Sequence, residues 1–163
     1  ICVIEGNKYR GVIEFKYVMQ NYAQNSPNYF ENMLGQTANM QANNIPCFQI
    51  LVVFEQSPYF GDDGRIKKIE TLSKHNLEKY IVLSRDNEDT FFHSPNKTLV
   101  IILKNPKIDS LIIGKTKQQY FNYINNTPII LNYSNQLFNF GDLVIYNNYE
   151  KFIKKVVHKI KSA

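Results

Sequence analysis

The sequence predicts a mixed α/β domain in which a central β-sheet is flanked by helices. Three patterns support this class: a hairpin over residues 1–18, a continuous apolar run over residues 47–54 and an amphipathic helix over residues 148–161. A strand that is apolar at every position is typical of a strand covered on both faces. The order strand, strand, helix, buried strand indicates one core whose helix crosses over a face of the sheet.

The elements follow from local signals. Residues 1–5 and a run ending at residue 18 alternate as strands around a Gly6-Asn7 turn. Ser26-Pro27 closes a polar connection and predicts a helix over residues 28–43. Pro58 and Gly-Asp-Asp-Gly predict a loop over residues 57–64. The later segments predict helices at 73–83, 116–125 and 148–161, and short strands at 99–103, 111–113, 129–133 and 143–146.

Composition limits the class of protein. The chain has 163 residues and a net charge of +5, which suits a polyanionic partner without requiring one. We treat residues 1–163 as a single domain, because no Pro-, Gly- or Ser-rich linker divides them. Without an apolar run of membrane-spanning length or a visible signal peptide, we expect a cytoplasmic protein with no membrane partner. The chain begins with Ile instead of Met, which indicates a fragment that lacks its natural N-terminus.

The two cysteines, Cys2 and Cys47, lie in apolar, strand-like runs without metal-binding spacing. Buried free thiols are therefore expected in preference to a disulfide or a metal site.

Alternation in the second strand places an acid and a lysine on one face. Glu14 and Lys16 alternate with Ile13, Phe15 and Tyr17, so the charged pair and the apolar side chains point to opposite faces. About 7 Å separates the charged pair along the strand. An acid and a lysine at this spacing are able to share a divalent metal and a polarised water, which is the chemistry of a phosphodiester-cutting site. The alternative is a surface ion pair worth at most about 1 kcal/mol.

The order of these features resembles the PD-(D/E)xK nuclease superfamily, to which restriction endonucleases and archaeal Holliday-junction resolvases belong. The resemblance covers residues 1–54 and includes the Gly-Asn hairpin, Glu14-Phe15-Lys16, the helix and the buried strand. It implies a restriction-endonuclease-like core and Mg²⁺-dependent cleavage of double-stranded DNA. Glu14 and the Phe15 carbonyl would hold Mg²⁺, and Lys16 would orient or help deprotonate the attacking water.

The family pattern also contains an Asp on the preceding strand, which this sequence does not display. With a two-residue turn, the cross-strand partner of Glu14 falls just before Ile1, and a carboxylate there would lie about 5 Å from Glu14. We therefore expect the second acid upstream of Ile1 or in another segment. Glu5 is on that strand, but its turn position puts it more than about 15 Å from Glu14.

Two further sets of residues are candidates. Nucleases of this kind often carry a supporting glutamine on the following helix, which corresponds to Gln36; a RecB-like motif would have Tyr where this chain has Met40. The alternative for Gln36 is a solvated helix face. Lysines on the last helix are candidates for contact with the DNA backbone, with a solvated helix face as the alternative. These lysines are Lys154, Lys155 and Lys159.

The most specific expectation is a type II restriction endonuclease that acts as a homodimer on a palindromic site, which rests on analogy with the family. Two alternatives remain open. One is a structure-selective nuclease of the junction-resolvase type, and the other is a catalytically silent α/β module that binds DNA or another partner.

Overall fold

The computed structural model describes residues 1–83, 94–105, 108–109, 112–126, 132–135 and 144–162, and within them the mixed α/β class is confirmed. The main sheet has the strand order β1-β2-β3-β6-β7, with β8 also paired to β6. Its strands are β1 (Cys2–Glu5), β2 (Lys8–Val18), β3 (Cys47–Phe54), β6 (Lys97–Lys104), β7 (Asn132–Tyr133) and β8 (Ile145–Tyr146). A separate two-stranded sheet consists of β4 (Gln56–Phe60) and β5 (Ile66–Thr71). The helices are α1 (Tyr22–Ala42), α2 (Lys74–Leu83), α3 (Lys117–Asn125) and α4 (Tyr149–Ser162).

The centre of the main sheet is parallel. β2, β3 and β6 run in the same direction, whereas β1 is antiparallel to β2. Every residue of β3 is buried, as its continuous apolar sequence predicts for a strand with cover on both faces. The connection from β2 to β3 is α1, which supplies the crossover that two adjacent parallel strands require.

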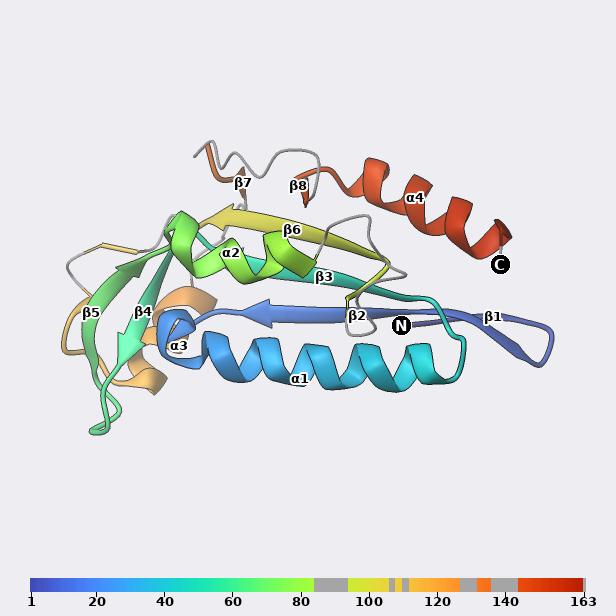
Figure 1. The fold of residues 1–163 in the computed structure, drawn as a ribbon. Helices are drawn as coiled ribbons and strands as arrows, with labels where there is room; N and C mark the ends of the chain where they lie inside the picture. Colours follow the sequence, from blue (N-terminus) through green and yellow to red (C-terminus); the bar gives the residue numbers. More distant parts are fainter. Residues whose placement is uncertain (84–93, 106–107, 110–111, 127–131, 136–143, 163) are drawn as a thin grey trace.

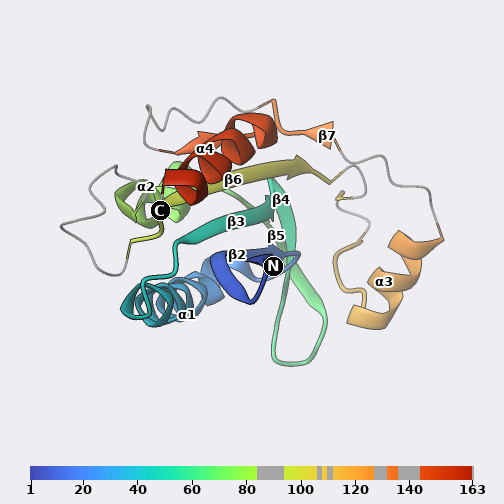
Figure 2. The same cartoon turned by 90° about the vertical axis from the view of Figure 1, so that its right-hand side faces the viewer.

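Helices cover both faces of this sheet. Met33 of α1 and Leu77 and Tyr80 of α2 pack on one face, together with alternate residues of β2, β3 and β6. Phe152 and Val156 of α4 pack on the other face, and Figure 1 shows α1 and α4 on opposite sides of the strands. α3 belongs to a third apolar cluster with the β4–β5 hairpin and lies away from α1 in Figure 2.

The opening hairpin has the predicted two-residue turn. Glu5 pairs with Lys8, and Gly6 has a φ of +58°, a conformation that favours glycine. A β-bulge between Val3 and Ile4 then shifts the register by one residue, so that Cys2 pairs with Val12.

The predicted start of α1 is wrong, because the helix begins at Tyr22 and contains Pro27. A proline inside a helix leaves the carbonyl four residues earlier without its N–H donor. Here the Ser26 hydroxyl donates to that carbonyl, on Ala23, at 3.3 Å. Asn21 fixes the helix start by bonding through its side chain to both the N–H and the carbonyl of Phe60.

The region after β3 also differs from the prediction. Residues 57–60 belong to β4, and only residues 61–64 form a turn, with Gly64 at a φ of +70°. Pro58 is compatible with β4 because a two-stranded sheet leaves one edge of each strand unpaired.

Three other predicted strands need correction or fall partly outside the described residues. Ile112 and Ile113 lie in a turn instead of a strand, and residue 111 is outside the described residues. The strands predicted at 129–133 and 143–146 correspond to the shorter β7 and β8, and residues 129–131 and 143 are likewise outside them.

We expect Phe152→Ala to destabilise the fold by about 3–5 kcal/mol, because Phe152 is fully buried beneath α4 and its removal leaves a cavity. Urea denaturation measures the change. Val157 of the same helix is 43 % exposed, so Val157→Ala should change stability by less than about 0.5 kcal/mol. Equal effects of the two substitutions would contradict the packing of α4 on the sheet.

Candidate functional site

Glu14 and Lys16 lie together on the α1-facing side of β2. The Lys16 Nζ is 3.3 Å from the Glu14 Oε1, and the side chains are 26 % and 10 % exposed respectively. The alternation of β2 therefore places the pair as the sequence predicts. The low exposure of Glu14 distinguishes the pair from a solvated ion pair on an open sheet, because a largely buried carboxylate needs partners to offset its lost hydration.

Gln36 contacts the same carboxylate from α1. With its amide nitrogen turned toward Glu14, Gln36 donates to Oε1 at 2.7 Å and to Oε2 at 3.2 Å. The opposite orientation would set two oxygen atoms against each other. The Gln36 side chain is itself exposed, so it lies over Glu14 at the molecular surface. The structure thus brings together three side chains that the sequence singles out: Glu14, Lys16 and Gln36.

The Phe15 carbonyl points to the side of β2 on which β1 pairs. Ile13 exchanges two backbone hydrogen bonds of 2.8 Å with Ile1. Because the pleat repeats every two residues, the backbone N–H and C=O of Phe15 point to the same edge as those of Ile13. The pairing of β1 with β2 runs from Glu5 and Lys8 at the turn to Ile1 and Ile13. The carbonyl of Phe15 therefore points to the side of β2 on which β1 pairs, while its side chain is 53 % exposed on the sheet face opposite Glu14.

A row of buried polar side chains extends inward from Glu14. Gln49 of β3 pairs with Glu14, and Thr98 of β6 pairs with Gln49, so all three lie side by side across the sheet. Gln49 is 1 % exposed and Thr98 is fully buried. Neither the Gln49 amide nor the Thr98 hydroxyl has a hydrogen-bond partner in the described part of the chain. Sequence reasoning missed both residues, although Gln49 was visible as the one amide within the apolar run of β3.

At this site, two oxygen-bearing groups are suited to bind a hard cation. The Glu14 carboxylate and the Phe15 carbonyl are ligands of the type that Mg²⁺ prefers, and Mg²⁺ commonly keeps several waters. Among the described residues, no group of three or more His, Cys, Asp or Glu side chains is placed to hold a metal. Glu5 is bound to Arg10 at the turn, 2.8 Å away, and does not join Glu14. The hairpin register puts the position opposite Glu14 one residue before Ile1.

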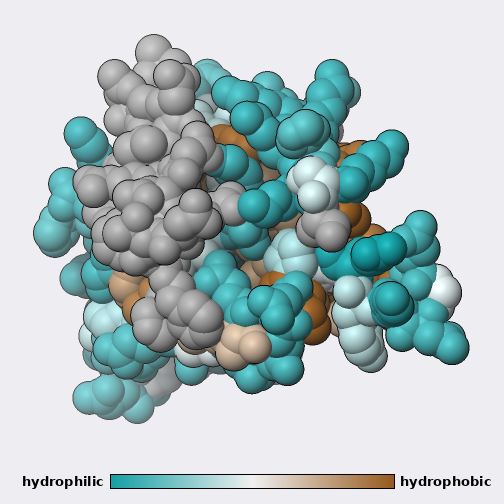
Figure 3. Space-filling view, turned by 45° about the vertical axis from the view of Figure 1, so that its right-hand side comes forward, coloured by the Kyte–Doolittle hydropathy of each residue, from teal (hydrophilic) through white to brown (hydrophobic). Residues whose placement is uncertain are grey.

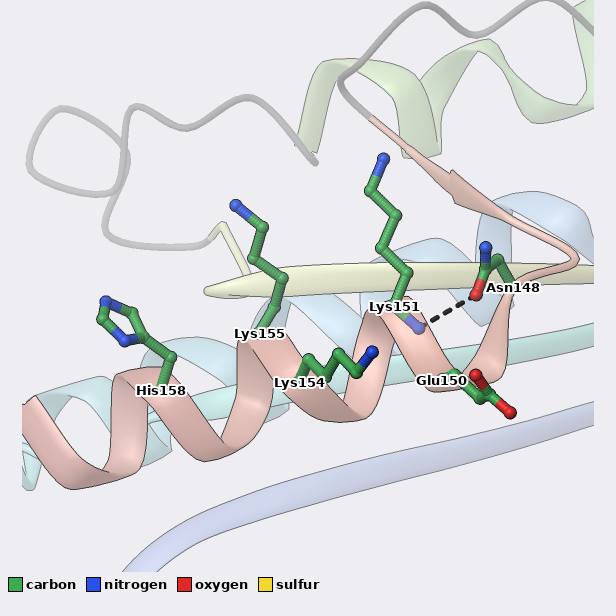
Figure 4. A pocket seen from close by; sticks show the side chains of 6 residues that line it. All are labelled: Asn148, Glu150, Lys151, Lys154, Lys155 and His158. Atoms are coloured by element: carbon green, nitrogen blue, oxygen red, sulfur yellow. Dashed lines mark hydrogen bonds between the residues drawn. The ribbon is translucent and has the colours of Figure 1, made fainter.

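The lysines predicted to contact DNA lie on a different side of the molecule. Lys154 and Lys155 are exposed on α4, and Lys159 is partly buried (Figure 4 shows the first two). Because α4 packs on the sheet face opposite α1, these lysines do not surround Glu14.

In the described part of the chain, no helix combines the length and the apolar character needed to cross a membrane. Figure 3 shows hydrophilic side chains over most of the described surface on that face, with small apolar areas between them.

Comparison with known proteins gives no relative. No family model, no curated protein and no solved structure matches the chain.

The cysteine prediction is correct in part. Both cysteines are free, and Cys47 is buried, with its Sγ 3.8 Å from the Thr37 Oγ1. Cys2 is exposed, so the prediction that it is buried was wrong. The reason is that β1 is an edge strand of the sheet, with β2 as its neighbour on one side only.

Lys16→Met should lower the free energy of unfolding by about 1 kcal/mol, because it leaves a largely buried carboxylate with fewer partners. Lys67→Met is the matched control: Lys67 pairs with Asp63, but their side chains are 53 % and 47 % exposed, so we expect less than about 0.5 kcal/mol. Urea denaturation of both variants measures the difference. A larger loss in the control would contradict the partly buried environment of Glu14.

The two thiols should differ in reactivity. Burial raises the pKa of the Cys47 thiol above its usual value, which keeps it protonated and unreactive near neutral pH. We expect a chromogenic disulfide reagent at pH 8 to titrate one thiol per folded chain and two after unfolding. Cys2→Ser should abolish the reaction of the folded protein, and a rapid second reaction before unfolding would contradict the buried position of Cys47.

Proposed function

We propose that this chain is a Mg²⁺-dependent DNA endonuclease domain that hydrolyses phosphodiester bonds. The observation that carries the proposal is that both Lys16 and Gln36 contact the Glu14 carboxylate on β2. The order of β1, β2, α1 and β3 supports a restriction-endonuclease-like core. A type II restriction endonuclease acting in the cytoplasm on double-stranded DNA, as a homodimer, is the most specific form of the proposal.

Each residue has a distinct role in this proposal. Glu14 and the Phe15 carbonyl are the groups that would hold Mg²⁺, which when bound lowers the pKa of a coordinated water and neutralises phosphate charge. Lys16 would donate hydrogen bonds to the attacking water and to the phosphate oxygens on which negative charge develops. Gln36 would hold the Glu14 carboxylate in one orientation, as residues behind a metal ligand commonly do.

A catalytically silent module with the same architecture is the second candidate. The observation that favours it is the small number of acidic groups at the site, since the described residues supply no group of three or more metal-binding side chains. In that case the pair of Glu14 and Lys16 would serve only to fix α1 against β2.

The protein incubated with supercoiled plasmid and Mg²⁺ should cleave the DNA, and excess EDTA should stop the reaction. Glu14→Gln and Lys16→Met remove a metal ligand and a charge-stabilising donor, so each should reduce the cleavage rate by at least about 100-fold. Gln36→Ala should reduce it by about 10- to 100-fold, because it acts through Glu14. Agarose gels over a time course measure the rates.

Lys67→Met is the control and should cleave at the rate of the unsubstituted protein, because Lys67 lies on β5 and pairs with Asp63. Equal cleavage by every variant, or no cleavage by any protein, would reject the nuclease proposal and favour the silent module. Discrete fragments from linear duplexes would support a restriction enzyme, and preference for branched DNA would support a structure-selective nuclease.

A further inference from the structure

The outer surface of α4 carries a concave cluster of basic side chains. A concavity of about 490 Å³ is lined by three lysines, one histidine, one asparagine and one glutamate. These residues are Lys151, Lys154, Lys155, His158, Asn148 and Glu150 (Figure 4). Asn148 also caps the helix, since its Oδ1 accepts from the Lys151 backbone N–H at 2.9 Å.

The three lysines of this cluster outnumber Glu150, the one acidic side chain that lines it. The ammonium groups of Lys151, Lys154 and Lys155 make no ion pair with any described carboxylate. Arg10, Lys67 and Lys68, by contrast, each pair with a neighbouring acid. Because like charges repel one another at close range, an anionic ligand would be stabilised at α4.

A fourth lysine lies beneath the cluster. Lys97, at the start of β6, is 8 % exposed. It shares the α4-facing side of the sheet with its neighbour Phe48. Burial lowers the pKa of Lys97, and the nearby charges of Lys155 and Lys151 lower it further. Lys97 is therefore close enough to Lys151 and Lys155 for their charges to affect its pKa.

The basic side chains are spread along α4 over a length that spans several phosphates of a nucleic acid. Lys151, Lys155 and His158 are four and three residues apart, which puts them on one stripe of the helix about 10 Å long. Figure 4 shows Lys151 and Lys155 extending to the same side of α4. Duplex DNA carries one negative charge per about 1.7 Å of its axis, so a stripe of this length meets a series of phosphates.

We propose that the α4 cluster binds the phosphate backbone of nucleic acid as an anchoring surface distinct from the Glu14 site. Lys151, Lys154 and Lys155 are its principal contacts. The choice of DNA as ligand rests on the proposed function, but the binding itself requires neither metal nor cleavage. Since α4 and Glu14 are on opposite faces of the sheet, the anchor contributes affinity without touching the reacting bond.

The test is fluorescence anisotropy of a labelled duplex at several salt concentrations, in EDTA so that no cleavage occurs. The patch variant carries three substitutions: K151Q, K154Q and K155Q. The control variant has the same net charge: K67Q, K68Q and K74Q. We expect the patch variant to bind at least about tenfold more weakly at 100 mM salt, and the slope of log K against log salt to fall by about 2 to 3. The control variant should keep the slope of the unsubstituted protein.

Single substitutions guard against a folding defect in the triple variant. K151Q, K154Q and K155Q alone should each reduce the slope by about 1 while leaving the circular dichroism spectrum and Tm unchanged. Unchanged binding by the patch variant, or equal losses in patch and control variants, would overturn the proposal. So would loss of binding to anionic phospholipid vesicles with unchanged duplex affinity, which would identify a lipid surface instead.

Different results would reject the α4 anchor and the nuclease proposal. Glu14→Gln should bind duplex in EDTA at least as tightly as the unsubstituted protein, because it removes a negative charge and leaves the α4 cluster intact. Patch-dependent binding without any cleavage activity would reject the proposed function and retain the anchor. Cleavage that depends on Glu14, together with unaltered binding and KM in the patch variant, would retain the proposed function and reject the anchor.

Discussion

The parallel pairing of β2 with β3 fixes the face that each side chain of β2 occupies. A shift of one residue would exchange the two faces, because side chains alternate along a strand. In the observed register, Glu14 pairs with Gln49 and turns toward α1, whereas Ile13 joins the apolar cluster beneath α4. Neighbouring residues of β2 therefore place a polar side chain on the α1 side of the sheet and an apolar side chain on the α4 side. Since α1 directly follows β2, the same register also carries Gln36 to Glu14.

The α1-facing side of the sheet is divided along the strands into an apolar part and a polar part. The apolar part includes Val18, Leu51, Val53, Val100 and Ile102. The polar part is the row of Glu14, Gln49 and Thr98, nearer the start of the strands. Burial of an aliphatic side chain contributes about 1.5–3 kcal/mol, whereas a buried polar group without a partner costs about 1–3 kcal/mol. The apolar part is therefore sufficient to hold α1, and a row that is locally unfavourable is more typical of a functional site than of a purely structural core.

Elements with a local sequence signal were predicted well, and those that depend on distant contacts were not. The hairpin turn, the buried strand β3 and the helix α4 follow from patterns within one segment. The start of α1 was missed because the Ser26 hydroxyl replaces the donor that Pro27 lacks, and because Asn21 is fixed by Phe60, 39 residues away. The loop predicted over residues 57–64 was wrong for β4, because Pro58 is tolerated in a strand only through the pairing of the completed sheet.

The candidate site was predictable to the extent that it follows from periodicity. Alternation gives the shared face of Glu14 and Lys16, but the contact of Gln36 depends on the rotation of α1, which Met33 sets by pointing into the core three residues earlier. The basic face of α4 was also visible in the sequence, yet no local pattern states which side of the sheet a helix covers. Its position opposite Glu14 separates the proposed phosphate-binding charge from the proposed catalytic groups. A nucleic acid that engages both must extend around the edge of the sheet, so its affinity and its rate of cleavage would depend on different residues.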